Sequence, residues 1–158
     1  MGRIVVGTDG SRSACAAVAW AAREAALRGA ELHVIHAWTP GLAAYPSPWY
    51  TPSDVGVEAS FEASQTVAAR ICEAAREQAM AAAPGVDARC SAIEGGSTQV
   101  LLEQSADADM LVVGARGHGG FIGLVLGSVS DQCARHAHIP VVVVPAPPGE
   151  KGPDAQPG

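Results

Sequence analysis

The sequence predicts a single α/β domain in which helices cover both faces of a parallel sheet. Five short apolar runs alternate along the chain with four segments of helical pattern, which is the order found in doubly wound α/β proteins. A length of 158 residues suggests one domain. With 48% hydrophobic residues, the chain can also bury a sizeable core.

Each predicted helix lies between two predicted strands. The strands are predicted over residues 3–8, 31–37, 86–93, 110–113 and 140–144. The helices are predicted over residues 12–28, 58–83, 97–106 and 128–137. Ser11 or Ser13 can cap the first helix, whose alanine-rich face can lie close on a sheet, and Gly29 ends it. Ser97 or Thr98 can cap the third helix.

Two segments lie outside this alternation. Residues 38–55 form a long irregular connection that contains four of the seven aromatic residues, namely Trp38, Tyr45, Trp49 and Tyr50. This connection is either a surface loop that packs its own aromatics or a lid over a ligand or partner. Residues 146–158 are polar and rich in proline and glycine, so we expect a domain over residues 1–145 followed by a disordered tail.

Charge and cysteine usage narrow the class of protein. A net charge of -6 and a pI near 5.2 argue against nucleic acid or an anionic membrane as the main partner. No apolar run approaches the ~20 residues of a membrane span, and no signal peptide follows the first methionine. The scattered cysteines predict reduced thiols rather than a disulfide framework or metal site; they are Cys15, Cys72, Cys90 and Cys133. We therefore expect a cytoplasmic protein.

The stretch from Met110 to Ser130 carries the strongest functional motif. Its apolar run, residues 110–113, leads into a loop whose glycines are Gly114, Gly117, Gly119, Gly120 and Gly123. Glycine permits positive φ and lets the backbone approach a ligand closely. A helical pattern then begins at Gly127-Ser128, where free N–H groups and the helix dipole favour an anion. The combination of strand, glycine loop and helix N-terminus predicts a phosphate-binding loop.

Other catalytic and binding motifs fit less well. A Walker P-loop needs a lysine on the phosphates, and the only lysine of this chain is Lys151 in the tail. Backbone N–H groups and the hydroxyls of Ser128 and Ser130 must then hold the phosphates. No dinucleotide-binding G-x-G-x-x-G follows the first strand, no G-x-S-x-G elbow is present, and no general base is identifiable. We expect no metal site, because no carboxylate cluster accompanies the histidines His33, His36, His136 and His138.

The glycine spacing resembles that of the ATP-binding branch of the universal stress protein family. Gly114, two residues, Gly117, nine residues and then Gly127-Ser128 form its G-x2-G-x9-G-[ST] pattern. The likeness extends over residues 3–145 and includes the Asp9-Gly10-Ser11 turn.

The sequence departs from the family pattern at two positions of this loop. Ala115 stands where serine is frequent, and His118 stands where arginine is frequent. The second change reduces the charge available for a phosphate contact.

The resemblance implies the strand order 3-2-1-4-5. In that order the first and fourth strands are neighbours at the point where the order reverses. Ligands of such sheets bind there, beyond the carboxyl ends of the strands. Asp9 follows the first strand and Gly114 follows the fourth, so the two motifs would face one crevice.

The resemblance also implies an ATP site in that crevice. Asp9 and the backbone at Ala37 would hold adenine, with Thr8 beside Asp9, and Gly114 would lie near the ribose. The phosphates, bridged by Mg²⁺ or Mn²⁺, would contact Gly117, Gly127, Ser128, Val129 and Ser130. Two alternatives stay open: Arg116 and His118 either screen phosphate charge or are solvated, and Asp9 either contacts the nucleoside or only bonds the turn backbone.

Members of the family act in stress adaptation and signalling and are at most slow ATPases, so we expect a nucleotide-dependent dimeric switch. The alternatives are a hydrolase of adenine nucleotides, for which we find no activated water or nucleophile, and a dimeric scaffold for another nucleotide such as cAMP. In the family order, residues 140–144 form an apolar edge strand. Pairing this edge with a second copy would protect it from aggregation, unless the preceding helix or the tail covers it.

Overall fold

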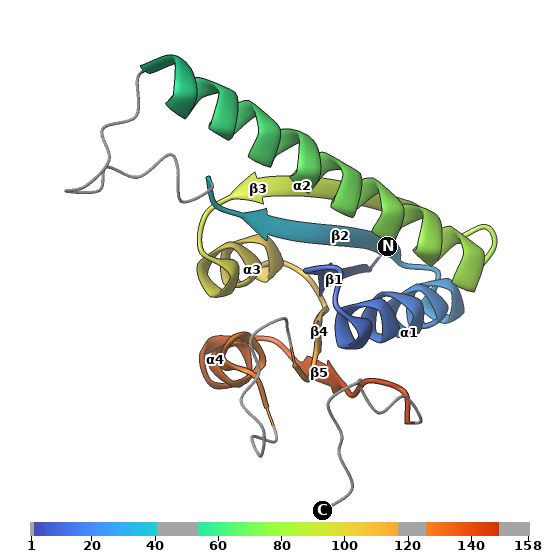
Figure 1. Ribbon diagram of the computed structural model, residues 1–158. Coiled ribbons are helices and arrows are strands. Elements are labelled where there is room, and N and C mark those ends of the chain that lie inside the picture. Colours follow the sequence, from blue (N-terminus) through green and yellow to red (C-terminus); the bar gives the residue numbers. More distant parts are fainter. Residues whose placement is uncertain (1, 41–53, 117–125, 149–158) are drawn as a thin grey trace, which may run out of the picture.

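The described residues form a five-stranded parallel sheet of order β3-β2-β1-β4-β5, which confirms the expected order (Figure 1). The strands are β1 (Arg3–Gly7), β2 (Glu31–Trp38), β3 (Ala88–Glu94), β4 (Met110–Gly114) and β5 (Val141–Val144). The computed structural model describes residues 2–40, 54–116 and 126–148. Most of the aromatic connection, the centre of the glycine loop and most of the tail lie outside the described residues.

Helices cover both faces of the sheet. The helices are α1 (Arg12–Arg28), α2 (Asp54–Ala82), α3 (Ser97–Ser105) and α4 (Ser128–His136). Helices α1 and α2 pack on one face, and α3 and α4 pack on the other (Figure 1). Helix α2 begins four residues before the predicted start, because Gly56 costs about 1 kcal/mol relative to alanine but does not end a helix. None of the helices in the described ranges is long and apolar enough to span a bilayer.

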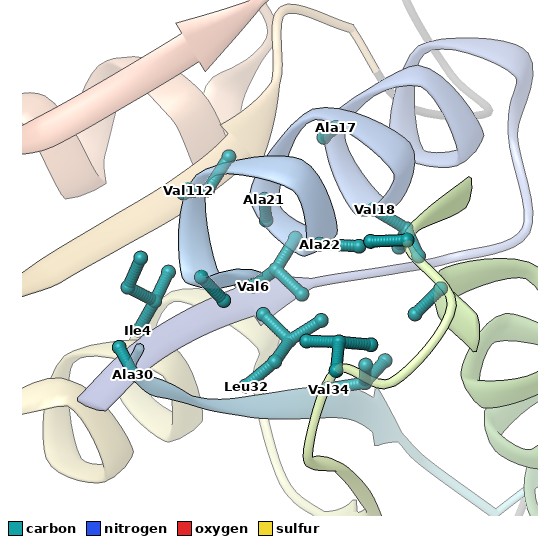
Figure 2. Packing of buried hydrophobic residues seen from close by; sticks show 14 of the residues in the cluster. Ile4, Val6, Ala17, Val18, Ala21, Ala22, Ala30, Leu32, Val34 and Val112 are labelled. Atoms are coloured by element: carbon teal, nitrogen blue, oxygen red, sulfur yellow. The ribbon is translucent and has the colours of Figure 1, made fainter. Parts of the chain in front are cut away.

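The core under α1 is built from small helical residues and branched strand residues. Ala17, Val18, Ala21 and Ala22 of α1 are fully buried. Figure 2 shows them packed against strand residues that include Ile4, Val6, Leu32, Val34 and Val112. An alanine ends at Cβ, so the backbone of α1 lies close to the sheet, as its small-residue face predicts. This close packing sets the position of the first turn of α1 relative to the strand ends.

The helix N-termini differ in how they are capped. Ser11 caps α1, and its hydroxyl accepts a hydrogen bond from the Ala14 N–H at 3.3 Å. Helices α3 and α4 instead begin after Gly96 and Gly127, and no side chain caps either of them. The predicted caps of α3, Ser97 or Thr98, were therefore wrong, because the extended backbone typical of an N-cap occurs at Gly96.

Gly114 lets the end of β4 approach the first turn of α1. A Cβ on Gly114 would lie 2.7 Å from the Ser13 carbonyl carbon and 2.8 Å from the Ala14 nitrogen. Both neighbours are backbone atoms of a packed helix, which cannot move aside as a flexible side chain would. Gly114 is thus required by packing, whatever else it contacts.

We predict that Gly114→Ser destabilises the fold, because its Cβ forces β4 and α1 apart. The loss of unfolding free energy should be about 1–3 kcal/mol, the usual cost of overpacking. Gly96→Ser is the matched control: a Cβ there meets nothing within 4 Å, and serine is a good N-cap. Equal stability of the two variants in urea denaturation would contradict the packing role of Gly114.

Candidate functional site

The ends of β1, β2 and β4 stand level at one edge of the sheet. Gly7 pairs with Ile35, and Val6 pairs with Val112. Continuing these registers by two residues puts Asp9 level with Ala37 and puts Thr8 level with Gly114. The structure therefore brings these predicted site residues together at the switch point of the sheet.

The turn after β1 is held by its own polar side chains. The Thr8 hydroxyl accepts a hydrogen bond from the Gly10 N–H at 3.2 Å, and Asp9 Oδ1 accepts one from the Ser11 N–H at 2.9 Å. Gly10 has a φ of 78°, which favours glycine. Asp9 thus hydrogen-bonds the turn backbone, which is one of the two roles considered for it. Its contact with a nucleoside stays a prediction.

The backbone of Ala37 extends past the end of β1. The Ile35 carbonyl accepts a hydrogen bond from the Thr8 N–H at 2.9 Å. Alternate residues of a strand direct their backbone groups to the same side, so the N–H and C=O of Ala37 also face the β1 side. Since β1 ends at Gly7, its ladder with β2 ends before Ala37.

His36 bonds the backbone carbonyl that would accept the next hydrogen bond between β1 and β2. Its Nδ1 lies 2.8 Å from the Thr8 carbonyl oxygen, and His36 is buried. A carbonyl only accepts hydrogen bonds, so we assign the proton to Nδ1. In a continued parallel ladder, this carbonyl would accept from the Ala37 N–H. The imidazole bonds this carbonyl where the ladder ends, and Ala37 lies two residues beyond Ile35, the last residue of β2 that pairs with β1.

Ser130 joins the two ends of the glycine loop. Its buried hydroxyl lies 3.0 Å from the carbonyl oxygens of both Ala115 and Gly127, to which it donates. The Gly127 N–H also donates to the Ala115 carbonyl at 2.7 Å. The loop therefore leaves and returns at one point, although Gly117 and His118 lie outside the described residues. Within the structure the Ser130 hydroxyl supports the loop, and its predicted phosphate contact stays untested.

Ser13 connects α1 to the ends of β4 and β5. Its hydroxyl donates to the Val144 carbonyl at 3.0 Å and accepts from the Arg116 N–H at 3.3 Å. The Ser11 hydroxyl lies 3.5 Å from the Arg116 carbonyl oxygen. These bonds place the backbone of Arg116 beside the first turn of α1, while its side chain is exposed.

The N-terminus of α4 is suited to an anion. Its first intrahelical bond runs from the Asp131 N–H to the Gly127 carbonyl at 3.0 Å, so the three preceding N–H groups have no place in the helical ladder. Those groups belong to Ser128, Val129 and Ser130. Helix dipoles favour negative charge here. Asp131, the acidic residue of this first turn, is paired with Arg135 at 3.1 Å.

A groove of about 610 Å³ opens between α3 and α4. The residues that line it are Gly96, Ser97, Thr98, Gln99, Leu102, Glu103, Val129, Gln132 and His136. Val129 belongs to the first turn of α4, so the groove reaches the N-terminus of that helix.

The two histidines of β2, His33 and His36, are not grouped with other possible metal ligands among the described residues. His33 Nε2 lies 2.8 Å from the Ser91 hydroxyl, and His33 and His36 point to opposite faces of the sheet because they are an odd number of residues apart. In the part of the chain that the structure describes, no three His, Cys, Asp or Glu side chains are grouped to hold a metal ion.

Sequence reasoning missed the roles of Ser13 and His36. Ser13 was considered only as an alternative helix cap, and His36 only as a possible metal ligand. Their partners, Val144, Arg116 and Thr8, are 131, 103 and 28 residues away in sequence. No local pattern signals such contacts, because they depend on the registers of the sheet.

Comparison with known proteins identifies relatives along nearly the whole chain. The family model of the universal stress protein family matches residues 1–145. One universal stress protein of Mycobacterium tuberculosis is 37% identical over 156 residues, covering 92% of this chain and 48% of the relative. A second one is 35% identical over 147 residues, covering 89% and 46%. The chain thus spans about half the length of the curated relatives it matches.

Solved structures share the fold. A universal stress protein in complex with cAMP is 29% identical, with a TM-score of 0.68 and coverage of 92% of this chain and 98% of that one. UspA from Lactobacillus plantarum is 20% identical, with a TM-score of 0.75 and coverage of 90% and 97%. Since the family model covers 145 residues and the strand order agrees, the chain belongs to the universal stress protein family.

Proposed function

We propose that this chain binds an adenine nucleotide, with ATP as the expected ligand, and works as a nucleotide-dependent dimeric switch in stress adaptation. The observation that carries the proposal is that the N-terminus of α4, which no side chain caps, and the backbone of Ala37 lie at the same end of the sheet. The N-terminus of α4 suits a phosphate group, and the backbone of Ala37 suits a nucleotide base. The 29% identical neighbour that binds cAMP adds support for this class of ligand.

Backbone groups would recognise the base. The Watson–Crick edge of adenine presents an amino donor beside a ring-nitrogen acceptor. Ala37 offers one C=O and one N–H on the same side of its strand, which matches that pair. Asp9, which the continued register puts level with Ala37, would accept hydrogen bonds from the nucleoside.

The N-terminus of α4 would hold the phosphates. Gly127 has no Cβ, the N–H groups of the first turn are available, and the exposed Ser128 adds a hydroxyl. Gly117 would extend these contacts, as the family pattern implies. Mg²⁺ or Mn²⁺ would be held through the phosphates, as the family resemblance implies.

Binding of ATP and cAMP can be compared directly by calorimetry, together with ADP. ATP presents three phosphates to the α4 N-terminus, whereas cAMP presents one singly charged phosphodiester. Tighter binding of ATP supports the switch, and tighter binding of cAMP supports the scaffold alternative. Identification of the nucleotide that co-purifies with the protein is an independent check, and steady release of phosphate would support slow ATP hydrolysis.

We predict that Gly127→Val lowers ATP affinity at least about 100-fold, because a branched side chain separates the phosphates from the α4 N–H groups. This loss of affinity corresponds to two charge-assisted hydrogen bonds of about 1.5 kcal/mol each. Gly96→Val makes the same change at the uncapped N-terminus of α3 and should bind ATP normally. Calorimetry on the folded variants measures both affinities. If Gly96→Val loses ATP affinity and Gly127→Val does not, the phosphate site lies at α3 instead.

We predict that Asp9→Ala weakens ATP and adenosine equally, by about tenfold for the loss of one charge-assisted hydrogen bond. Inorganic triphosphate should bind as before, because it lacks the nucleoside. Asp9→Asn is the control for the turn, since its amide oxygen can still accept from the Ser11 N–H. If Asp9→Ala lowers only the melting temperature, with all three affinities unchanged, Asp9 merely holds the turn.

The proposed dimer would form along β5. This strand pairs only with β4 among the described strands, and its four valines are half-buried. The carbonyls of Pro140 and Val144 accept bonds from the β4 side, so Val141 and Val143 direct their backbone groups to the free edge. An uncovered apolar edge of this kind pairs readily with a second copy.

We predict that Val143→Pro converts the dimer into a monomer, because it removes an outward N–H but leaves the β4–β5 bonds in place. Val143→Thr keeps the N–H and the branched shape, so it should remain dimeric. Sedimentation at tens of micromolar measures both. A monomeric wild type, or a dimer unaffected by proline, would exclude this interface.

A further inference from the structure

Two cysteine side chains meet between α2 and β3, away from the nucleotide crevice. Cys90 stands opposite Val34 in the register of β3 and β2. Cys72 Sγ lies 3.9 Å from the Val34 carbonyl oxygen, so both side chains are on the face covered by α2. Cys90 Sγ also lies 3.5 Å from Oε2 of Glu73, the residue that follows Cys72 in α2, so the two cysteines share the same surroundings.

The two thiols differ in access to solvent and in their further partners. Cys72 is 1% exposed, whereas Cys90 is only half-buried. Cys90 Sγ lies 3.5 Å from Glu73 Oε2, and Glu73 pairs with Arg76 at 2.5 Å. The hydrogen bond from Arg76 lowers the pKa of Glu73, which keeps that carboxylate ionised as an acceptor for the Cys90 thiol.

We propose that Cys72 and Cys90 are a redox modification site, at which a hydroperoxide converts the two thiols into an intramolecular disulfide. The Cys90 sulfur, the more accessible of the two, attacks the peroxide oxygen, forms a sulfenic acid and releases water or the corresponding alcohol. The neighbouring Cys72 sulfur then attacks the Cys90 sulfur and displaces its hydroxyl as water. The two thiols lose two electrons and two protons, and the peroxide takes up both.

The other cysteines do not share this arrangement. Cys133 is fully buried and belongs to the cluster on the opposite face of the sheet. Cys15 is half-buried, and its sulfur lies 3.9 Å from the Gly10 carbonyl oxygen. Cys15 therefore serves as the control for a partly exposed thiol with no thiol partner.

The environment makes the reaction slow at neutral pH. Burial raises the pKa of Cys90 above its ordinary value and raises that of Cys72 to about 12. The reactive thiolate is then a minor species at pH 7, and its fraction grows as pH rises toward these pKa values. The rate of disulfide formation should therefore increase from pH 7 to pH 9.

Peptide mapping of the full chain tests the proposal. The native protein is treated with hydrogen peroxide, blocked with iodoacetamide and digested with trypsin without reduction. Cleavage after the arginines puts Cys72 on peptide 71–76 and Cys90 on peptide 90–116. We expect these peptides to be joined, with the loss of two hydrogen atoms, and to separate on treatment with dithiothreitol.

Matched variants distinguish this pair from general thiol oxidation. Cys15→Ser should form the same crosslink as the wild type, whereas Cys90→Ser should leave Cys72 as an alkylated thiol. The proposal is overturned if wild-type Cys90 is recovered only as a thiol, as a sulfinic acid, or joined to Cys90 of another chain. None of these readouts depends on nucleotide binding, so failure of one proposal leaves the other intact.

Discussion

The close approach of β4 to the first turn of α1 determines the geometry of the crevice. It depends on the absent side chain of Gly114 and on the small buried face of α1, which together bring two backbones into contact. Ser13 uses this proximity to hold the Arg116 N–H and the Val144 carbonyl. The glycine loop therefore leaves the sheet from a fixed point, and Ser130 returns it to the same point through Ala115.

The crevice is built mainly from backbone groups. The proposed donors are the Ala37 backbone and the first turn of α4, and the His36 imidazole bonds the Thr8 carbonyl where the β1–β2 ladder ends. Backbone groups are independent of side-chain identity. The proposed site would therefore depend little on the identity of Ala115 and His118, where the family pattern often has serine and arginine. What it requires instead is small residues where two backbone segments approach each other closely, as β4 and α1 do at Gly114.

The three proposed sites occupy separate parts of one sheet. The nucleotide crevice lies at the carboxyl ends of the central strands, the dimer edge is β5, and the cysteine pair joins α2 to the opposite edge strand, β3. A parallel sheet provides these places because its strand ends, its two edges and its two faces are chemically distinct. A disulfide between Cys72 and Cys90 would join α2 to β3 without altering the dimer edge.

The sequence by itself determined the fold class, because continuous apolar runs between helical segments are compatible with few arrangements other than a doubly wound sheet. It also located the Asp9 turn and the start of α4, whose signals are local glycines. The order of the strands came from family resemblance, since an apolar run does not encode its neighbour. Tertiary structure alone decided the bond of His36 to the Thr8 carbonyl and the proximity of Cys72 to Cys90. Each of these depends on the register between strands or on a helix lying over them, and contacts between residues distant in sequence leave no periodicity to read.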